Sequence, residues 1–154
     1  MAILDESWRE VRVKKWRILV VGLIVLASLA MVVGLWIRMR SDLRVGELLA
    51  RNNCDVCHDL TRAKKNEKGP YLWGIVNRPA GSVEFPYSGP FLNRIRERPV
   101  VWTEENLERF ITNPALFIPQ IQMAQHTIEH PYAFEGMDSS ANRRDLIAWL
   151  KTLQ

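Results

Sequence analysis

The sequence predicts an all-α protein, in which a single N-terminal membrane-spanning helix precedes a small domain of three helices and long loops. Residues 18–37 form an unbroken run without a charged side chain. Three later stretches, residues 45–53, 103–113 and 139–153, place apolar residues at the spacing of one helix face. Residues 60–102 are rich in glycine and proline and show no such period, so we expect loops there.

The uncharged run is long enough to cross a bilayer. At about 1.5 Å per residue, a helix over residues 18–37 spans about 30 Å, the thickness of the hydrocarbon core. A buried core helix should have a polar face, and this run has none. A signal peptide usually has a shorter apolar stretch followed by small residues, whereas residues 36–40 read WIRMR. We therefore expect an uncleaved transmembrane anchor over residues 18–40.

Basic residues flank this anchor unevenly. Five precede it and three follow it: Arg9, Arg12, Lys14, Lys15 and Arg17, then Arg38, Arg40 and Arg44. Because basic flanks favour the cytoplasmic side, residues 1–17 are expected in the cytoplasm. The chain would then cross the inner (cytoplasmic) membrane once, with the lipid bilayer as a partner and residues 41–154 as a periplasmic domain.

The net charge of +4 belongs to the anchor region. Residues 1–40 hold seven of the 21 basic residues and three of the 17 acidic ones, which leaves fourteen of each for residues 41–154. The domain also lacks a basic face interleaved with aromatic residues. We therefore expect no nucleic-acid partner.

Cys54 and Cys57 are the only cysteines, and His58 follows them directly. A zinc site needs four ligands, and using His126 and His130 for it would leave His58 without a role. A redox CxxC should follow a strand, and a disulfide over so short a loop would stabilise little. CxxCH is the attachment signature of c-type haem, in which both thiols bond to the porphyrin and the histidine binds iron. The motif predicts one covalent haem c on the oxidising side of the membrane.

A haem would also explain the domain's size and its loops. About 110 residues is small for a self-sufficient core, and loops as long as residues 60–102 are uncommon unless something organises them. The best-defined helix, residues 103–113, has Thr103 as its N-cap and stops before Pro114. A large apolar cofactor buried among three helices would supply the missing core.

Further motifs follow in order along residues 44–154. They comprise Gly46 and the stretches 69–74 (GPYLWG), 77–81 (NRPAG), 101–107 (VWTEENL), 113–123 (NPALFIPQIQM) and 145–150 (DLIAWL). Together with CxxCH, they resemble the class I cytochromes c of the mitochondrial and cytochrome c2 type. The resemblance covers the whole soluble part and implies the class I cytochrome c fold, with three main helices and long loops around one haem.

The resemblance assigns roles to five further residues. The Pro70 carbonyl would accept a hydrogen bond from His58, which fixes the ring and raises its basicity. Arg78, Tyr87 and Trp102 would bind or offset the haem propionates. Met123 would be the sixth iron ligand, and its neutral thioether would favour reduced iron.

The residues alone leave the sixth ligand open among Met123, Met137, His126 and His130. Met123 is favoured because it lies four residues after Pro119 within the family motif. Met137 stands where the family has an aliphatic core residue, and the two histidines lie in a segment longer than the family's. Bis-histidine ligation would lower the reduction potential, and an empty site would bind gases or peroxide.

Three departures from the family pattern bear on function. Phe110 and Ile121 stand where a tyrosine and a threonine often support the methionine ligand. Residues without charge replace lysines that ring the haem edge in many members: Ala115, Leu116 and Gln122. Steering by a lysine ring is therefore not expected. Residues 84–98 have a non-standard length and are a candidate docking surface.

The link between anchor and domain is short. Residues 38–44 reach at most about 25 Å and are not a glycine- or proline-rich tether. We therefore expect an electron-transfer protein, not itself an enzyme, held as a subunit beside a larger respiratory or photosynthetic membrane complex. The alternatives are a tethered carrier between two complexes, or a haem gas sensor or peroxidase-like protein with an open sixth site.

Overall fold

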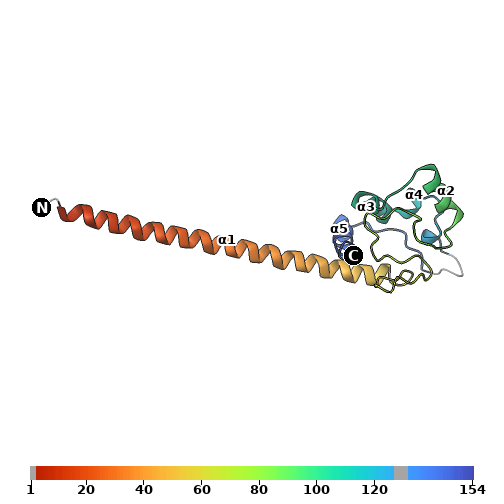
Figure 1. Cartoon of the computed structure of the whole chain (residues 1–154), viewed down its shortest axis with the longest axis horizontal. Coiled ribbons are helices and arrows are strands. Elements are labelled where there is room, and N and C mark those ends of the chain that lie inside the picture. Colours follow the sequence, from red (N-terminus) through yellow and green to blue (C-terminus); the bar gives the residue numbers. More distant parts are fainter. Residues whose placement is uncertain (1–2, 127–131) are drawn as a thin grey trace. The chain divides into compact units, whose positions relative to one another are not determined.

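The structure is a computed structural model that describes residues 3–126 and 132–154 (Figure 1). It divides into two compact units, Met1–Arg40 and Ser41–Gln154. Within the described residues the regular structure is helical, apart from one isolated antiparallel bridge between Pro79 and Val101. The prediction of an all-α chain is confirmed.

Helix α1 runs from Ile3 to Asn53 and supplies the regular structure of the first unit. From residue 15 to residue 40 every side chain is exposed, although most of them are apolar. A core helix would be buried, so this stretch is not the core of a soluble domain. Its length and composition suit a membrane span, and a signal sequence near the N-terminus has the same properties.

The last turns of α1 belong to the second unit and pack against α5 (Ser140–Leu150). Ala50 is fully buried, and a Cβ added to Gly46 would meet the Asp145 carbonyl and lie 2.8 Å from the Trp149 Cβ. Residues four apart share one helix face, so two small side chains let the helices approach closely. Trp149 is expected to fill the volume opposite Ala50, and it is partly buried against the same core.

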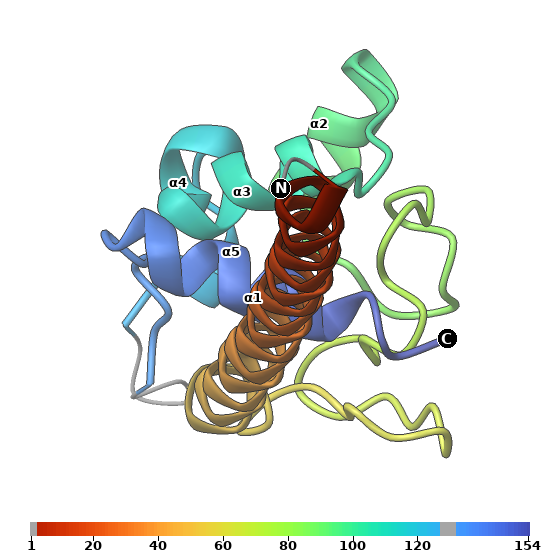
Figure 2. The ribbon, with the colours of Figure 1, turned by 90° about the vertical axis from the view of Figure 1, so that its left-hand side faces the viewer.

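Helices α3 (Glu104–Thr112), α4 (Pro114–Phe117) and α5 lie together, with α3 in contact with both others (Figure 2). Thr103 accepts a hydrogen bond from the Asn106 N–H, which confirms the predicted N-cap. Asn113 ends α3 and caps α4 through the Leu116 N–H at 2.8 Å. The buried apolar residues of these two helices, α3 and α5, are Leu107, Ile111, Leu146, Ile147 and Leu150.

The expectation of loops throughout residues 60–102 is wrong at one place, because α2 spans Gly89–Glu97. Proline near its first position presets the helical φ angle. Phe91 is buried, stacks on Tyr87 with ring centroids 4.5 Å apart, and has Ile95 four residues later on the same face. The nine residues hold three apolar side chains, and one of them, Leu92, is exposed, so no clear period marks this helix in the sequence and its tertiary contacts determine it. The last short element, η1, spans Gln122–Ala124.

Candidate haem-binding site

The two cysteines and His58 lie on one tight turn where α1 ends. The Cys54 N–H donates to the Ala50 carbonyl at 2.8 Å, so the turn continues directly from the helix. The N–H groups of Cys57 and His58 both donate to the Cys54 carbonyl, at 3.0 and 2.9 Å. Both cysteines are free and partly buried. The turn therefore brings two thiols and one imidazole together within five residues.

The His58 ring is oriented by the Pro70 carbonyl, which lies 2.6 Å from Nδ1. A carbonyl oxygen only accepts, so Nδ1 carries the proton and Nε2 presents its lone pair. Burial lowers the pKa of His58 below its ordinary value, and the hydrogen bond to Pro70 partly opposes this effect. At neutral pH the ring is uncharged, which is the form that binds a metal.

Gly69 lies directly against the His58 ring. Its N–H donates to the Cys57 carbonyl at 2.8 Å, which places the backbone of residue 69 against the imidazole. A Cβ built on Gly69 would lie 2.6 Å from Nδ1 and 2.9 Å from Nε2 of His58. No larger residue fits without moving the ring. The GPYLWG motif contains Gly69, but the sequence assigned a role only to the neighbouring Pro70. A glycine next to the proline expected to orient His58 was the available signal.

The chemistry of the turn separates the haem interpretation from its rivals. Burial raises the pKa of the Cys54 thiol to about 12, with smaller contributions from Asp55 and Cys57. An attacking cysteine of a redox CxxC needs a lowered pKa, so this thiol has the opposite character. Among the residues that the structure describes, no three His, Cys, Asp or Glu side chains gather as a metal site. Two free thiols beside one oriented imidazole fit covalent haem attachment.

The residues expected near the propionates come together. The backbone N–H of Trp102 donates to the Arg78 carbonyl at 2.9 Å, and the Trp102 side chain is buried. The Arg78 guanidinium donates to the carbonyls of Tyr71 and Trp73 at 2.8 and 3.1 Å. Burial lowers the pKa of Arg78 and raises that of Tyr87, and Arg78 opposes the rise at Tyr87. A partly buried cation thus lies beside the phenols of Tyr71 and Tyr87, which suits a carboxylate-bearing ligand.

The four sixth-ligand candidates have different surroundings. Met123 lies in η1, partly buried against the hydrophobic core. Met137 is buried, and its N–H donates to the Ile111 carbonyl of α3 at 2.9 Å. His126 is exposed and pairs with Glu135, with Nε2 and Oε1 3.0 Å apart. His130 lies outside the described residues. His126 therefore has a surface partner of its own.

An aromatic cluster packs beside Trp102. Phe110 of α3 lies 5.0 Å from the Trp102 ring and 5.7 Å from that of Phe117, measured between centroids. Arg94 and Arg109 each place a guanidinium within 6 Å of the Phe117 ring, at 5.6 and 5.7 Å. Sequence reasoning marked Phe110 only as a missing hydroxyl. In the structure it is part of an aromatic cluster with Trp102 and Phe117.

Comparison with known proteins agrees with the motifs, although no family model matches the chain. Cytochrome c of Gibberella zeae is 32% identical over 110 residues, which are 71% of this chain and 92% of that protein. Cytochrome c-550 of Ancylobacter novellus is 35% identical over 100 residues, 64% of this chain and 84% of that protein. Cytochrome c-type cyt cy of Rhodobacter capsulatus is 31% identical over 113 residues, 73% of this chain and 49% of that protein. The chain therefore belongs to the cytochrome c family, whose cofactor is covalently bound haem c.

Proposed function

We propose that this electron-transfer haem protein is anchored in the inner membrane by residues 18–40 and acts as a subunit beside a larger respiratory or photosynthetic complex. The turn from Cys54 to His58 carries the haem part of the proposal, because it presents two free thiols and one oriented imidazole. The exposed apolar stretch of α1 supports the membrane part.

Each residue of the site has a proposed task. Cys54 and Cys57 would hold the haem through thioether bonds, and His58 Nε2 and Met123 would be its iron ligands. When bound, the haem iron takes up and releases single electrons. Because the Pro70 carbonyl and the Gly69 backbone fix the His58 ring, that ligand keeps its orientation in both oxidation states. A fixed ligand keeps the reorganisation on electron transfer small.

The propionates would lie where Arg78, Tyr87 and Trp102 meet. A guanidinium in this partly buried position offsets carboxylate charge more strongly than it would in water. The Phe110 and Phe117 rings pack beside the Trp102 ring and add apolar surface there. Together these residues would bind the polar edge of the haem and leave its remaining surface in apolar contacts.

Anchoring and topology rest on α1 and its flanking charges. Trp36 lies under the Arg40 guanidinium, 3.8 Å from the ring centroid, at the expected end of the span. Indole and guanidinium groups suit the interface between lipid and water. The basic excess before residue 18 supports a cytoplasmic N-terminus and a periplasmic haem domain.

Fractionation and purification in mild detergent test anchoring and complex membership. The full chain should stay with alkali-washed membranes and co-purify with a larger redox complex, while a control with a cleavable signal peptide in place of residues 1–40 should yield soluble periplasmic haem protein. A full chain that runs alone in mild detergent would contradict the subunit proposal and favour a tethered carrier. Recovery of the full chain in the soluble fraction would contradict the anchor.

Replacing Met123 and Met137 separately tests the sixth ligand. Met123→Ala should abolish the weak red band of methionine-ligated ferric haem and open the ferrous iron to carbon monoxide. Met137→Ala should keep the band but lower the free energy of unfolding by about 2–5 kcal/mol, because it empties a buried site. If Met137→Ala loses the band and Met123→Ala keeps it, the ligand assignment is wrong.

A further inference from the structure

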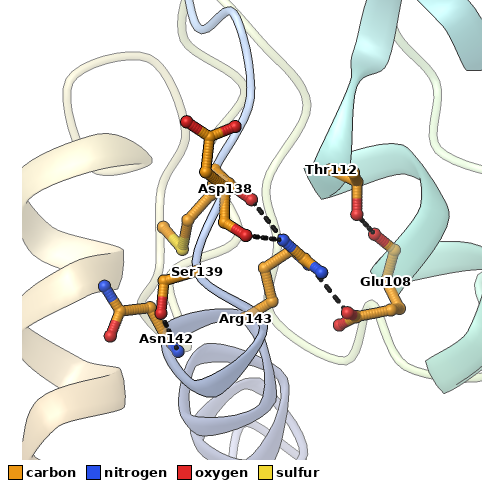
Figure 3. A network of polar contacts seen from close by, with 7 residues as sticks. Glu108, Thr112, Asp138, Ser139, Asn142 and Arg143 are labelled. Carbon is orange, nitrogen blue, oxygen red and sulfur yellow. Dashed lines mark hydrogen bonds and ion pairs between the residues drawn. The ribbon is translucent and has the colours of Figure 1, made fainter.

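A polar network links α3 to α5 (Figure 3). Arg143 of α5 is buried, and its Nε lies 2.7 Å from Oε1 of Glu108 on α3. Its Nη1 donates to the carbonyls of Met137 and Asp138, at 2.5 and 2.7 Å. The second carboxylate oxygen of Glu108 is buried without a hydrogen-bond partner. The guanidinium is thus divided between a carboxylate and the backbone of the preceding segment.

Stability alone does not explain this arrangement. The cost of removing two charges from water can exceed their attraction, so an apolar pair in the same place is often as stable. The partly unsatisfied Glu108 carboxylate adds to that cost. What an apolar pair cannot do is donate to two successive carbonyls. The network therefore fixes the path of residues 137 and 138.

Residues 134–138, which we term the strap, connect this network to Met123. At one end the Phe134 N–H donates to the Met123 carbonyl at 2.9 Å. In the middle, Gly136 has φ +130°, and an added Cβ would lie 3.0 Å from the Thr112 carbonyl carbon at the end of α3. Further on, the Met137 N–H donates to the Ile111 carbonyl at 2.9 Å. The strap thus runs from the Met123 backbone to Arg143 and contacts α3 at Gly136 and Met137.

We propose that Arg143 and Glu108 are positioning residues for the sixth ligand, acting on Met123 through the strap. This inference rests on the proposed role of Met123. A thioether is a neutral ligand, and Phe110 and Ile121 offer it no hydroxyl. The strength of the iron–sulfur bond then depends on how firmly the backbone holds Met123. The strap is one of its backbone supports, and Arg143 holds the strap's far end.

Binding of imidazole to the oxidised haem protein measures how firmly Met123 stays bound to the iron. Imidazole occupies the sixth site only when the methionine has left, so its apparent affinity scales with the open fraction. In the full chain, Arg143→Gln should lower the apparent Kd for imidazole by about tenfold, which corresponds to about 1.4 kcal/mol. Arg143→Lys should act similarly, because a single ammonium cannot reproduce the fork. Glu108→Gln, which keeps both carbonyl bonds, should lower the Kd by less.

Two matched controls separate positioning from general stability. Lys151→Gln breaks the exposed Lys151–Glu104 pair, which joins the same two helices at 2.7 Å without touching the strap. Leu146→Ala empties a buried site in α5. Both should leave the imidazole Kd within about twofold of the parent protein, although Leu146→Ala lowers the denaturation midpoint.

The outcomes are distinguishable. If Arg143→Gln and Leu146→Ala shift the Kd equally at equal loss of stability, the pair is merely structural and the inference fails. If Arg143→Gln does not fold, a Glu108→Gln protein with lowered stability and an unchanged Kd overturns it. If the parent protein already lacks the methionine band and binds imidazole as an open site, the proposed role of Met123 fails, and the inference with it.

Discussion

Replacing both Cys54 and Cys57 with serine is expected to abolish covalent haem and leave the second unit largely unfolded. Serine hydroxyls do not form the thioether bonds, and residues 60–88 contain no helix of their own to hold a core together. A domain of about 110 residues has little stability to lose when its cofactor is gone. Haem staining after denaturing electrophoresis and circular dichroism measure the two effects.

The single variants serve as controls for that experiment. Cys54→Ser and Cys57→Ser each keep one thiol on the turn and should retain some covalently bound haem. Haem that still migrates with the double variant through denaturing electrophoresis would show that another residue attaches it. A folded double variant without haem would contradict the expectation that the haem supplies part of the hydrophobic core of the domain.

Replacing Gly69 with alanine is expected to have the second largest effect. The new methyl group would overlap the His58 ring and push it from the Pro70 carbonyl. Overpacking of this kind costs about 1–3 kcal/mol of folding free energy, and the displaced ring would also bind iron less well. Lower haem incorporation, an altered absorption spectrum and a lower denaturation midpoint should appear together.

Gly89 provides the matched control, because an added Cβ there meets nothing within 4 Å. Gly89→Ala makes the same chemical change at an open position and should alter stability by no more than about 0.5 kcal/mol. If Gly69→Ala and Gly89→Ala behave alike, the close contact between the Gly69 backbone and the His58 ring does not constrain the ring.

Local signals in the sequence were enough to predict α3 and the turn at Cys54. Thr103 caps α3 and Pro114 follows its last turn, so its bounds depend on neighbours in the chain. The turn at Cys54 is equally local, since its hydrogen bonds run to residues three or four positions back. Such features can be predicted because the groups that determine them lie within a few residues.

Features that depend on distant partners could not be predicted in the same way. Helix α2 depends on Phe91 and Ile95 meeting Tyr87 and the backbone at Gly81, which nine residues of sequence do not reveal. The Arg143–Glu108 pair joins positions 35 residues apart, with no pattern that connects them.

The sixth ligand is another feature that the sequence alone could not determine. Spacing left four candidates, and only the fold gives His126 a surface partner in Glu135 and ties the Met137 backbone to α3. Met123 lies against the core and its carbonyl accepts a hydrogen bond from the Phe134 N–H, in keeping with the proposed ligand. Tertiary contacts, rather than position in the chain, distinguish otherwise similar side chains.

Mass spectrometry of the parent protein isolated from membranes tests the central claim most directly. We expect the mass of the chain to be raised by one haem, and digestion to place that addition on the peptide that holds Cys54, Cys57 and His58. A peptide with two unmodified or disulfide-linked cysteines would contradict covalent attachment at this turn, and with it the proposed electron-transfer site.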